Sequence, residues 1–288
     1  MSDSMKKSKK MITFALAVVL GLSAMTGCGR SGGGNDEKKI VVGATIKPHS
    51  EILHSDAFQS KLKELGYTID VVEYTDYVQP NSATQDGSLD ANFFQHKPFL
   101  DSYNEGNKAD LVSVAQIHYE PFGLYPGTSD SLEAMKDDAC IAVPNDTSNE
   151  ARALLLLQEA GLITVDDNAG LKATIKDITS NPHKITFKEI ESAQTPMVLD
   201  EVDYSVINGN YALQAGLSVE KDALVVEDAS SEAADTYANI LVVKSGNEET
   251  DKTKALVEAL TSKEVSDYMN ETYQGAVVPL FIYRKLLK

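Results

Sequence analysis

Short apolar segments alternate with segments of helical periodicity along most of this chain, and this alternation restricts the possible folds more than any other feature. Strands are predicted at 40–45, 67–74, 89–94 and 111–117. Helices are predicted between them, with Asn81 as the cap of a short helix. A β-α-β-α-β order is typical of a mostly parallel sheet with helices on both faces, so the sequence predicts an α/β fold.

A stretch with two prolines and two glycines, residues 120–127, follows this set and is interpreted as a crossing between two lobes. A second set of elements comes next. It is predicted to contain a helix near 131–136, a strand at 140–143, a long helix after Thr147, and strands at 184–190 and 204–208. A strand at 237–243 can return to the first lobe, and two helices then close the chain.

The chain starts with a leader. Several lysines precede an apolar run from Met11 to about Met25. That run is too short for a membrane span, which needs roughly 20 apolar residues, and it indicates a secretory signal. The small residues before Cys28 resemble a bacterial lipoprotein signal, in which the cysteine is acylated, although Met25 departs from the usual leucine. A Gly-rich polar tether follows, and a plain signal peptide with an incidental cysteine is the alternative.

The predicted organisation therefore has five parts. They are a lipoprotein signal peptide at 1–27, a flexible tether at 28–39, lobe 1 at 40–122, lobe 2 at 123–238, and a return to lobe 1 at 239–288.

Charge and cysteine content narrow the possible partners. The chain has 26 Lys and Arg against 43 Asp and Glu, a formal net charge of −17. Such acidity argues against nucleic acid and against an anionic lipid face as partners. Once Cys28 is acylated, Cys140 has no partner for an internal disulfide, so it is predicted to be a buried, inert thiol.

One stretch in the second half combines a strand end, a tight loop and a helix start. Residues 140–143 are apolar, Pro144 ends the strand, and Thr147 with Glu150 has the spacing of a capping box. A helix that begins at a sheet edge favours an anion at its N-terminus, and Arg152 can hold a carboxylate with two parallel hydrogen bonds. The predicted role is to bind a ligand carboxylate, with amide groups supplied by Asn145 and Asn149. An ordinary capped helix with a solvated arginine is the other interpretation.

No enzyme motif stands out. The five histidines are scattered, and the chain lacks an H-E-x-x-H pattern, cysteine pairs, G-x-S-x-G, a dinucleotide fingerprint and a phosphate loop. We therefore predict no enzyme activity, no cofactor and no metal. The alternative of a different class is an exported hydrolase or a metal-binding lipoprotein that uses His96 and His118.

Polar and aromatic residues gather where predicted strands end, which is where open α/β sheets bind ligands. Each also has an ordinary explanation, because such aromatics are often core residues, His96 is in place to cap a helix, and Asn208 is a common turn residue. The candidates are Tyr77, Phe94, His96 and Phe99 in the first half, Asn145, Asn149, Arg152 and Asn208 in the second, and Asn239 near the return crossing.

The segment 90–100, DANFFQHKPFL, closely resembles the signature of the methionine-binding lipoproteins, the MetQ/NlpA family of ABC-importer substrate-binding proteins. Residues 76–81, 143–157 and 206–208 also match the family in order, and the resemblance runs from about Ile40 to the C-terminus. It implies a two-lobed, periplasmic-binding-protein-like fold of type II with the ligand in the cleft between the lobes.

The resemblance also implies roles. Arg152 would hold the ligand carboxylate, and Asn149, Asn208 and Asn239 would fix the carboxylate and the ammonium group. An aromatic wall of Tyr77, Phe94, His96 and Phe99 would enclose the side chain; Phe99 is often tyrosine in the family. The implied protein is anchored by its lipid on the extracytoplasmic face of the cell membrane. There it binds L-methionine or a related amino acid and delivers it to an ABC permease and its ATPase.

Overall fold

The computed structural model describes residues 38–133, 135–228 and 232–280, and these parts belong to one compact unit. The leader, Cys28 and most of the predicted tether lie outside the described residues. Helices and strands alternate along the chain, as expected for the α/β class. Among the described helices, none has the length and apolar character needed to cross a membrane.

A six-stranded sheet, in the order β13-β4-β12-β3-β1-β2, forms the centre of the first lobe. Strand β1 is parallel to β2 and β3, whereas β12 is antiparallel to both of its neighbours, β3 and β4. The carboxyl ends of β1, β3 and β4 and the beginning of β12 therefore meet at one edge. The strands are β1 (Lys39–Thr45), β2 (Thr68–Tyr74), β3 (Ala91–His96), β4 (Leu111–Tyr119), β12 (Asn239–Lys244) and β13 (Val278–Pro279).

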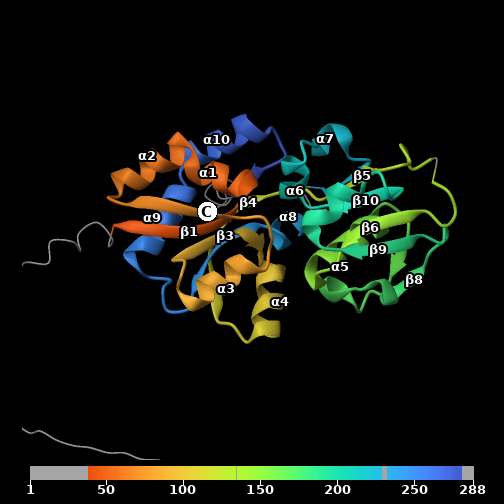
Figure 1. Cartoon of the computed structure of the whole chain (residues 1–288), viewed down its shortest axis with the longest axis horizontal. Coiled ribbons are helices and arrows are strands. Elements are labelled where there is room, and N and C mark those ends of the chain that lie inside the picture. The colour runs from red at the N-terminus through yellow and green to blue at the C-terminus, as the bar shows by residue number, and fades with distance from the viewer. Residues whose placement is uncertain (1–37, 134, 229–231, 281–288) are drawn as a thin grey trace, which may run out of the picture. The chain divides into compact units, whose positions relative to one another are not determined.

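Helices cover both faces of this sheet (Figure 1). The main core lies between the sheet and α1, α2, α9 and α10, and Phe58, Leu256 and Met269 are buried in it. On the other face, Leu100 of α4 packs on Ile240 and Val242 of β12. The helical elements are η1 (Ile46–Ser50), α1 (Glu51–His54), α2 (Asp56–Glu64), α3 (Gln79–Asp86), α4 (Lys97–Asn107), α9 (Asp251–Leu260) and α10 (Lys263–Tyr273).

The second lobe has a five-stranded sheet in the order β11-β5-β10-β6-β9. Strands β9, β6 and β10 are parallel, and β5 is antiparallel to β10 and β11. Two very short strands, β7 and β8, pair separately. The strands are β5 (Gly123–Pro126), β6 (Cys140–Pro144), β7 (Thr164–Val165), β8 (Ile178–Ser180), β9 (Thr186–Ile190), β10 (Tyr204–Ile207) and β11 (Val225–Val226).

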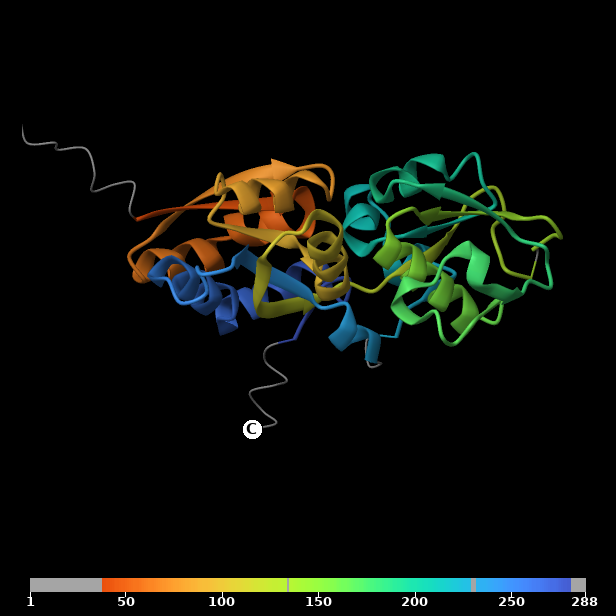
Figure 2. The same cartoon turned by 90° about the horizontal axis from the view of Figure 1, so that it is seen from below.

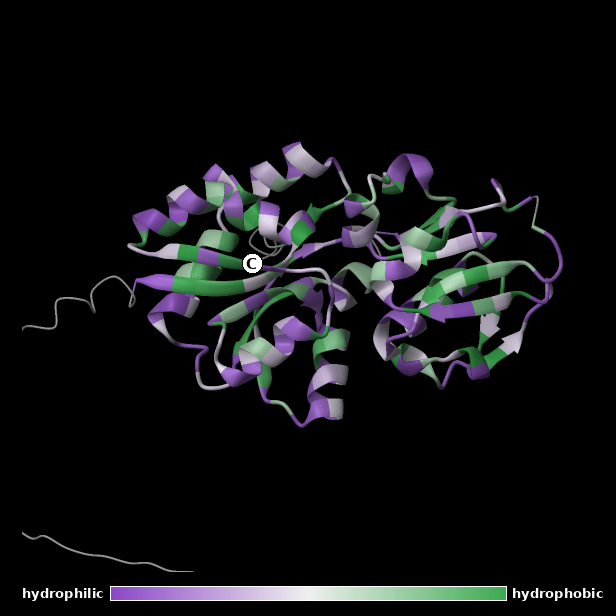
Figure 3. Ribbon diagram, in the orientation of Figure 1, coloured by the Kyte–Doolittle hydropathy of each residue, from purple (hydrophilic) through white to green (hydrophobic). Residues whose placement is uncertain are grey.

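The apolar face of α5 packs on this second sheet through Leu154 and Leu157, and hydropathy colouring shows apolar and polar residues mixed along the strands of this lobe (Figure 3). Helix α6 contributes Tyr211 to a smaller cluster around Tyr125. The helical elements are α5 (Thr147–Glu159), η2 (Gly170–Lys172), η3 (Ile175–Asp177), η4 (Ser192–Val198), α6 (Gly209–Gln214), α7 (Val219–Asp222) and α8 (Glu232–Thr236).

Two crossings join the lobes, and both can be followed in Figure 2. The first crossing, residues 120–122, connects β4 to β5, and the second, residues 227–238, connects β11 to β12 and contains α8. Because β12 lies between β3 and β4, the return of the chain completes the interior of the first sheet.

Several local predictions were wrong. The described residues of 131–136 form bends and turns without a helix. Asn81 lies inside α3 and donates to Gln95 instead of capping the helix. Of the three candidate N-caps of α5, Asp146, Thr147 and Ser148, the structure selects Asp146, whose carboxylate accepts the backbone N–H of Asn149, so the capping-box spacing of Thr147 and Glu150 is not used. Cys140 is half-buried at the first residue of β6 and is a free thiol.

Candidate functional site

Strand register brings distant residues together at the edge of the first sheet. Asn239, the first residue of β12, lies opposite His96 at the end of β3 and opposite His118 near the end of β4. Glu120 follows β4 directly. From the second lobe, β6 leads through a loop into α5, which carries Asn149 and Arg152. The parallel arrangement therefore concentrates polar groups where the two lobes face each other.

A pocket lies at this junction. The structure brings to it all of the predicted binding residues except Asn145, which instead lines an adjoining hollow with Tyr77 and Phe99. Four further residues complete the lining and were not predicted. The lining residues are Tyr77, Phe94, Gln95, His96, Phe99, Glu120, Asn149, Arg152, Asn208, Gly209, Asn210 and Asn239.

Three aromatic rings form one wall of the pocket. The ring centroids of Tyr77, Phe94 and Phe99 lie 5.6–5.9 Å apart, with Phe99 edge-on to the other two. The Tyr77 hydroxyl donates to Asn210 Oδ1 at 2.5 Å, so its polar end is satisfied. This wall offers ring edges and faces to an apolar ligand group.

His96 both caps α4 and lines the pocket. The two interpretations of its sequence position, helix cap and pocket residue, are therefore compatible. Its Nδ1 accepts the backbone N–H of Phe99 at 3.2 Å, which leaves the proton on Nε2. That Nε2–H donates to Asn149 Oδ1 at 3.1 Å. Burial, and then the nearby Arg152, lowers the pKa of His96 to about 4, so the ring is neutral at pH 7.

The side chain of Asn149 makes its hydrogen bonds within the protein. Its Oδ1 accepts from His96 and from Asn208 Nδ2, and its Nδ2 donates to Asp146. It therefore positions its neighbours, although the family resemblance implied direct ligand contact. Asn208 differs, because its Oδ1 is buried and has no hydrogen-bond partner in the described part of the chain.

Arg152 is buried between the crossings and is already paired. Its Nε donates to Glu227 at 3.1 Å, and its Nη2 donates to Glu227 and to the backbone oxygen of Glu120. The guanidinium also lies over the rings of Tyr237 and Phe122, at 4.3 and 4.7 Å. One edge of the planar guanidinium is thus occupied, since the hydrogen bonds to Glu227 and to the Glu120 backbone use Nε and Nη2 rather than Nη1.

Glu227 is the residue beside the pocket that sequence reasoning missed most completely. Burial raises its pKa, but the Arg152 guanidinium outweighs burial and the pKa is lowered overall. The Tyr119 hydroxyl also donates to this carboxylate. Glu227 therefore stays ionised and ties the second crossing to α5 and to the end of β4.

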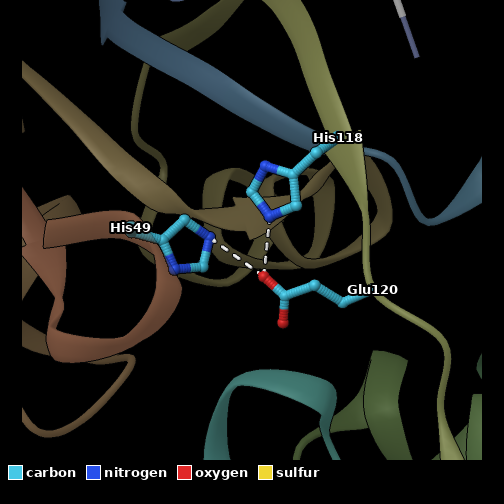
Figure 4. A group of neighbouring side chains, drawn as sticks. All are labelled: His49, His118 and Glu120. Carbon is cyan, nitrogen blue, oxygen red and sulfur yellow. Dashed lines mark hydrogen bonds and ion pairs between the residues drawn. The ribbon is translucent and has the colours of Figure 1, made fainter. Parts of the chain in front are cut away.

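Glu120 lies in a different buried group, with His49 and His118 (Figure 4). His118 Nε2 donates to Glu120 Oε1 at 2.7 Å, and His49 Nε2 lies 3.4 Å from the same oxygen. Burial lowers the pKa of His49 to about 4 and that of His118 to about 3, so both rings are neutral. Burial also raises the pKa of Glu120.

Two histidines and a glutamate form a possible zinc ligand set, but the geometry here fits hydrogen bonds better. Tetrahedral zinc ligands about 2.1 Å from the metal lie about 3.4 Å from each other, whereas His118 Nε2 and Glu120 Oε1 are 2.7 Å apart. His96, which the metal-binding alternative used, bonds to Asn149 instead of joining this group.

Of the unpredicted lining residues, Gln95 is bonded to Asn81 and Asn92 beneath the pocket. Gly209 and Asn210 follow Asn208 directly, so their place next to a candidate residue was a usable signal. Glu120 follows a strand end in the same way. Glu227 also follows a short strand directly, but its pairing with Arg152 had no signal because that residue is far away in the sequence.

These features define a class: a two-lobed binding protein of type II with a polar and aromatic pocket where its lobes meet. The chain belongs to the NlpA lipoprotein family, whose pattern matches residues 40–281.

Individual relatives agree with this assignment. The chain is 40% identical over 277 residues to the methionine-binding lipoprotein MetQ of Bacillus subtilis, covering 94% of this chain and 99% of that protein. The crystal structure of a lipoprotein from Ruminococcus gnavus is similar, with a TM-score of 0.83 and 53% identity over 84% of this chain and 99% of that one. A nutrient binding protein from Burkholderia cenocepacia, solved bound to methionine, has a TM-score of 0.79 and 41% identity over 84% of this chain and 100% of that one.

Proposed function

We propose that this protein binds the zwitterion of L-methionine, or of a close relative, and delivers it to an ABC permease and its ATPase. The observation that carries the proposal is the set of polar atoms in the pocket that the protein leaves unused. Charged groups removed from water need partners of opposite charge or hydrogen-bond type, so the unused atoms describe the ligand.

The unused donors suit a carboxylate. Arg152 offers Nη1, and Asn210 Nδ2 is buried without a partner in the described part of the chain. Asn239 accepts from His49 through its Oδ1, at 3.0 Å, so its amide nitrogen remains to donate. Three donors, one of them cationic, match the acid end of an amino acid.

The unused acceptors suit an ammonium group, and the aromatic wall suits a thioether. Asn208 Oδ1 is buried and unpartnered, and Glu120 adds a carboxylate at the same pocket. Sulfur next to aromatic edges gains about 0.3–1.5 kcal/mol per contact, which favours methionine over an aliphatic side chain of equal length. The two relatives named for methionine support the same ligand.

Lobe closure provides the mechanism without any bond being made or broken. We propose that residues 40–122 and 239–288 act as one lobe and 123–238 as the other, with the two crossings as the hinge. A ligand that contacts Asn239 on one lobe and Arg152 on the other stabilises the closed arrangement, which the permease can then recognise.

Calorimetry on protein freed of bound ligand by unfolding and refolding tests the proposal. L-methionine is expected to bind saturably, and norleucine, which replaces the sulfur with a methylene, about tenfold more weakly if several sulfur–ring contacts form. D-methionine measures the stereochemical preference. Absence of saturable methionine binding contradicts the proposed ligand. Equal affinity for norleucine contradicts the proposed role of the aromatic wall in recognising sulfur.

We also propose that Cys28 is acylated and anchors the protein on the extracytoplasmic face of the cell membrane. The leader and the lipoprotein family support this location. A Cys28→Ala variant is expected to appear in the soluble fraction after cell disruption, because a single-residue change removes the acyl chains. Retention of that variant in the washed membrane pellet contradicts the anchor.

A further inference from the structure

We propose that Glu120 is the counter-charge for the ligand's ammonium group, so that the site selects molecules with an unmodified, positively charged α-amino group. This inference rests on the proposed function and deepens it. Glu120 lines the pocket, is 5% exposed, and belongs to the first crossing between the lobes. It was not among the residues implied by the sequence.

The first argument is the lack of a cationic partner. Arg152, whose charge reaches Glu120, donates from Nη2 to the backbone oxygen of Glu120 and pairs with the carboxylate of Glu227. The side-chain groups that contact the Glu120 carboxylate are the neutral rings of His49 and His118. A buried carboxylate held only by neutral donors is an incomplete site, because desolvation disfavours its charge until a cation arrives.

The second argument is that both histidines act on one carboxylate oxygen. A carboxylate only accepts, so His118 donates its Nε2–H to Oε1 at 2.7 Å. His49 takes the Thr45 hydroxyl on Nδ1 at 2.7 Å, so its Nε2–H is directed between Asn239 Oδ1 and Glu120 Oε1. The two rings fix the orientation of the carboxylate through Oε1, and the backbone of Asn210 adds a further neutral donor.

The third argument is the position of Oε2. A methyl group built at Gly209 would lie 3.1 Å from Glu120 Oε2 and 2.8 Å from Glu120 Cβ, so the two residues are in close contact. Gly209 directly follows Asn208, whose buried Oδ1 has no partner among the described residues. Two acceptors are therefore supplied by neighbouring parts of one pocket wall, which matches an ammonium group with several N–H donors.

The site then separates the two charges of the ligand. Arg152, Asn210 and Asn239 offer donors to the acid end, while Glu120 and Asn208 offer acceptors to the amino end. An N-acetylated ligand loses the positive charge, so it leaves Glu120 without a counter-charge. A hydroxyl in place of the amine keeps the size but leaves Glu120 without a cation.

The experiment compares ligands and variants by calorimetry. For the native protein, L-methionine is expected to bind at least about 30-fold more tightly than its 2-hydroxy analogue, since hydrogen bonds between charged groups are strong in a buried site. N-acetyl-L-methionine is expected to show no measurable binding. These ligand comparisons need no variant, so a folding defect in a variant cannot hide the answer.

Glu120→Gln keeps the shape of the side chain and removes its charge. The affinity for L-methionine is expected to fall at least about tenfold, and the affinity for the 2-hydroxy analogue less than about threefold. Glu150→Gln is the matched control, because that glutamate lies on α5 outside the pocket and accepts from the backbone N–H of Ile175. It is expected to leave both affinities unchanged.

The outcomes separate this inference from the proposed function. Equal weakening of both ligands in Glu120→Gln assigns the residue a structural role and overturns the inference, as does unchanged methionine affinity. A native protein that prefers the amine by less than threefold also overturns it, with methionine binding intact. If the native protein does not bind methionine at all, the proposed function fails and this inference fails with it.

Discussion

The two crossings each bury one glutamate, and the two carboxylates have opposite environments. Glu120 in the first crossing and Glu227 in the second are almost equally hidden, at 5% and 6% exposure. Glu227 has a guanidinium and a tyrosine hydroxyl, and its pKa is lowered overall. Glu120 has two neutral imidazoles, and burial raises its pKa.

This difference shows that burial alone does not decide whether a carboxylate is structural or poised for a ligand. Glu227 already has a permanent cation, so it holds Arg152, the second crossing and β4 together. Glu120 has oriented hydrogen-bond donors but no cationic side chain in contact with its carboxylate. This is the environment expected of a carboxylate that pairs with a positively charged ligand group.

The largest effect is expected from removing the cation. Arg152→Ala leaves Glu227 buried and unpaired, so the free energy of unfolding should fall by about 3–5 kcal/mol. The ligand carboxylate also loses its charged donor, and methionine affinity should fall at least about 100-fold. Urea unfolding and calorimetry measure the two losses separately.

The double variant Arg152→Ala, Glu227→Gln separates structure from binding. It removes the orphaned charge, so most of the stability should return while the affinity stays low. If affinity returns together with stability, Arg152 acts only by supporting the fold. If neither returns, Glu227 is not the group that makes the arginine variant unstable.

The next effect is a loss of stability in acid. His49 and His96 have pKa values lowered to about 4, and His118 to about 3, against 6.5 in an unfolded chain. Below pH 6.5 the unfolded state therefore binds more protons, and stability should decline as the pH falls towards about 4. Each such group contributes a slope of about 1.4 kcal/mol per pH unit within that window.

Glu120 opposes this trend, because a raised pKa costs stability at neutral pH and the cost disappears as the carboxyl group is protonated. Three histidines outweigh one glutamate, so the net change remains a loss. Urea unfolding at stepped pH values checks the slope, and His118→Asn should reduce it. A flat profile between pH 6.5 and 4 would show that the rings are not neutral in the native state.

A smaller effect is expected on ligand affinity. Because the pKa of Glu120 is raised, acidification converts it to a neutral carboxyl group that cannot serve as a counter-charge. His49, His118 and Arg152 surround it and stay in one charge state above about pH 5. Methionine affinity should therefore fall as the pH is lowered. In Glu120→Gln the dependence should vanish, and a persisting dependence would assign it to another group.

The smallest effect is expected at the aromatic wall, away from both carboxylates. Phe99→Tyr adds a hydroxyl to a ring that meets Tyr77 and Phe94 edge-on. Since the ring contacts are retained, methionine affinity should change less than about fivefold, or about 1 kcal/mol. Calorimetry checks this. A loss comparable to that of Arg152→Ala would mean that the wall, not the charges, dominates binding.

The sequence was informative about the pocket wherever a functional residue lies at a strand end. His96, Asn208 and Asn239 could be proposed because a change from apolar to polar residues marks the sheet edge. Their mutual contacts could not be proposed, because the antiparallel register of β12 decides that Asn239 faces both His96 and His118.

The charge pairs were beyond sequence reasoning. Arg152 was predicted to bind the ligand carboxylate, and its pairing with Glu227 depends on how the second crossing folds back over α5. With 43 acidic residues in the chain, composition cannot single out one carboxylate. Glu120 and Glu227 became distinguishable only through their neighbours. The sequence led us to expect that Arg152 would give two parallel hydrogen bonds to the ligand carboxylate. In the structure its Nε and Nη2 bond to protein groups, and Nη1 is left for the ligand.

The place of β12 inside the first sheet has a consequence for the order of events after synthesis. The five strands of the second sheet all come from one continuous span, Gly123–Val226, so that half has its complete sequence first. The first half lacks an interior strand until Asn239–Lys244 emerges near the end of the chain. A chain still being translated therefore exposes the unpaired edges of β3 and β4 until β12 has been made.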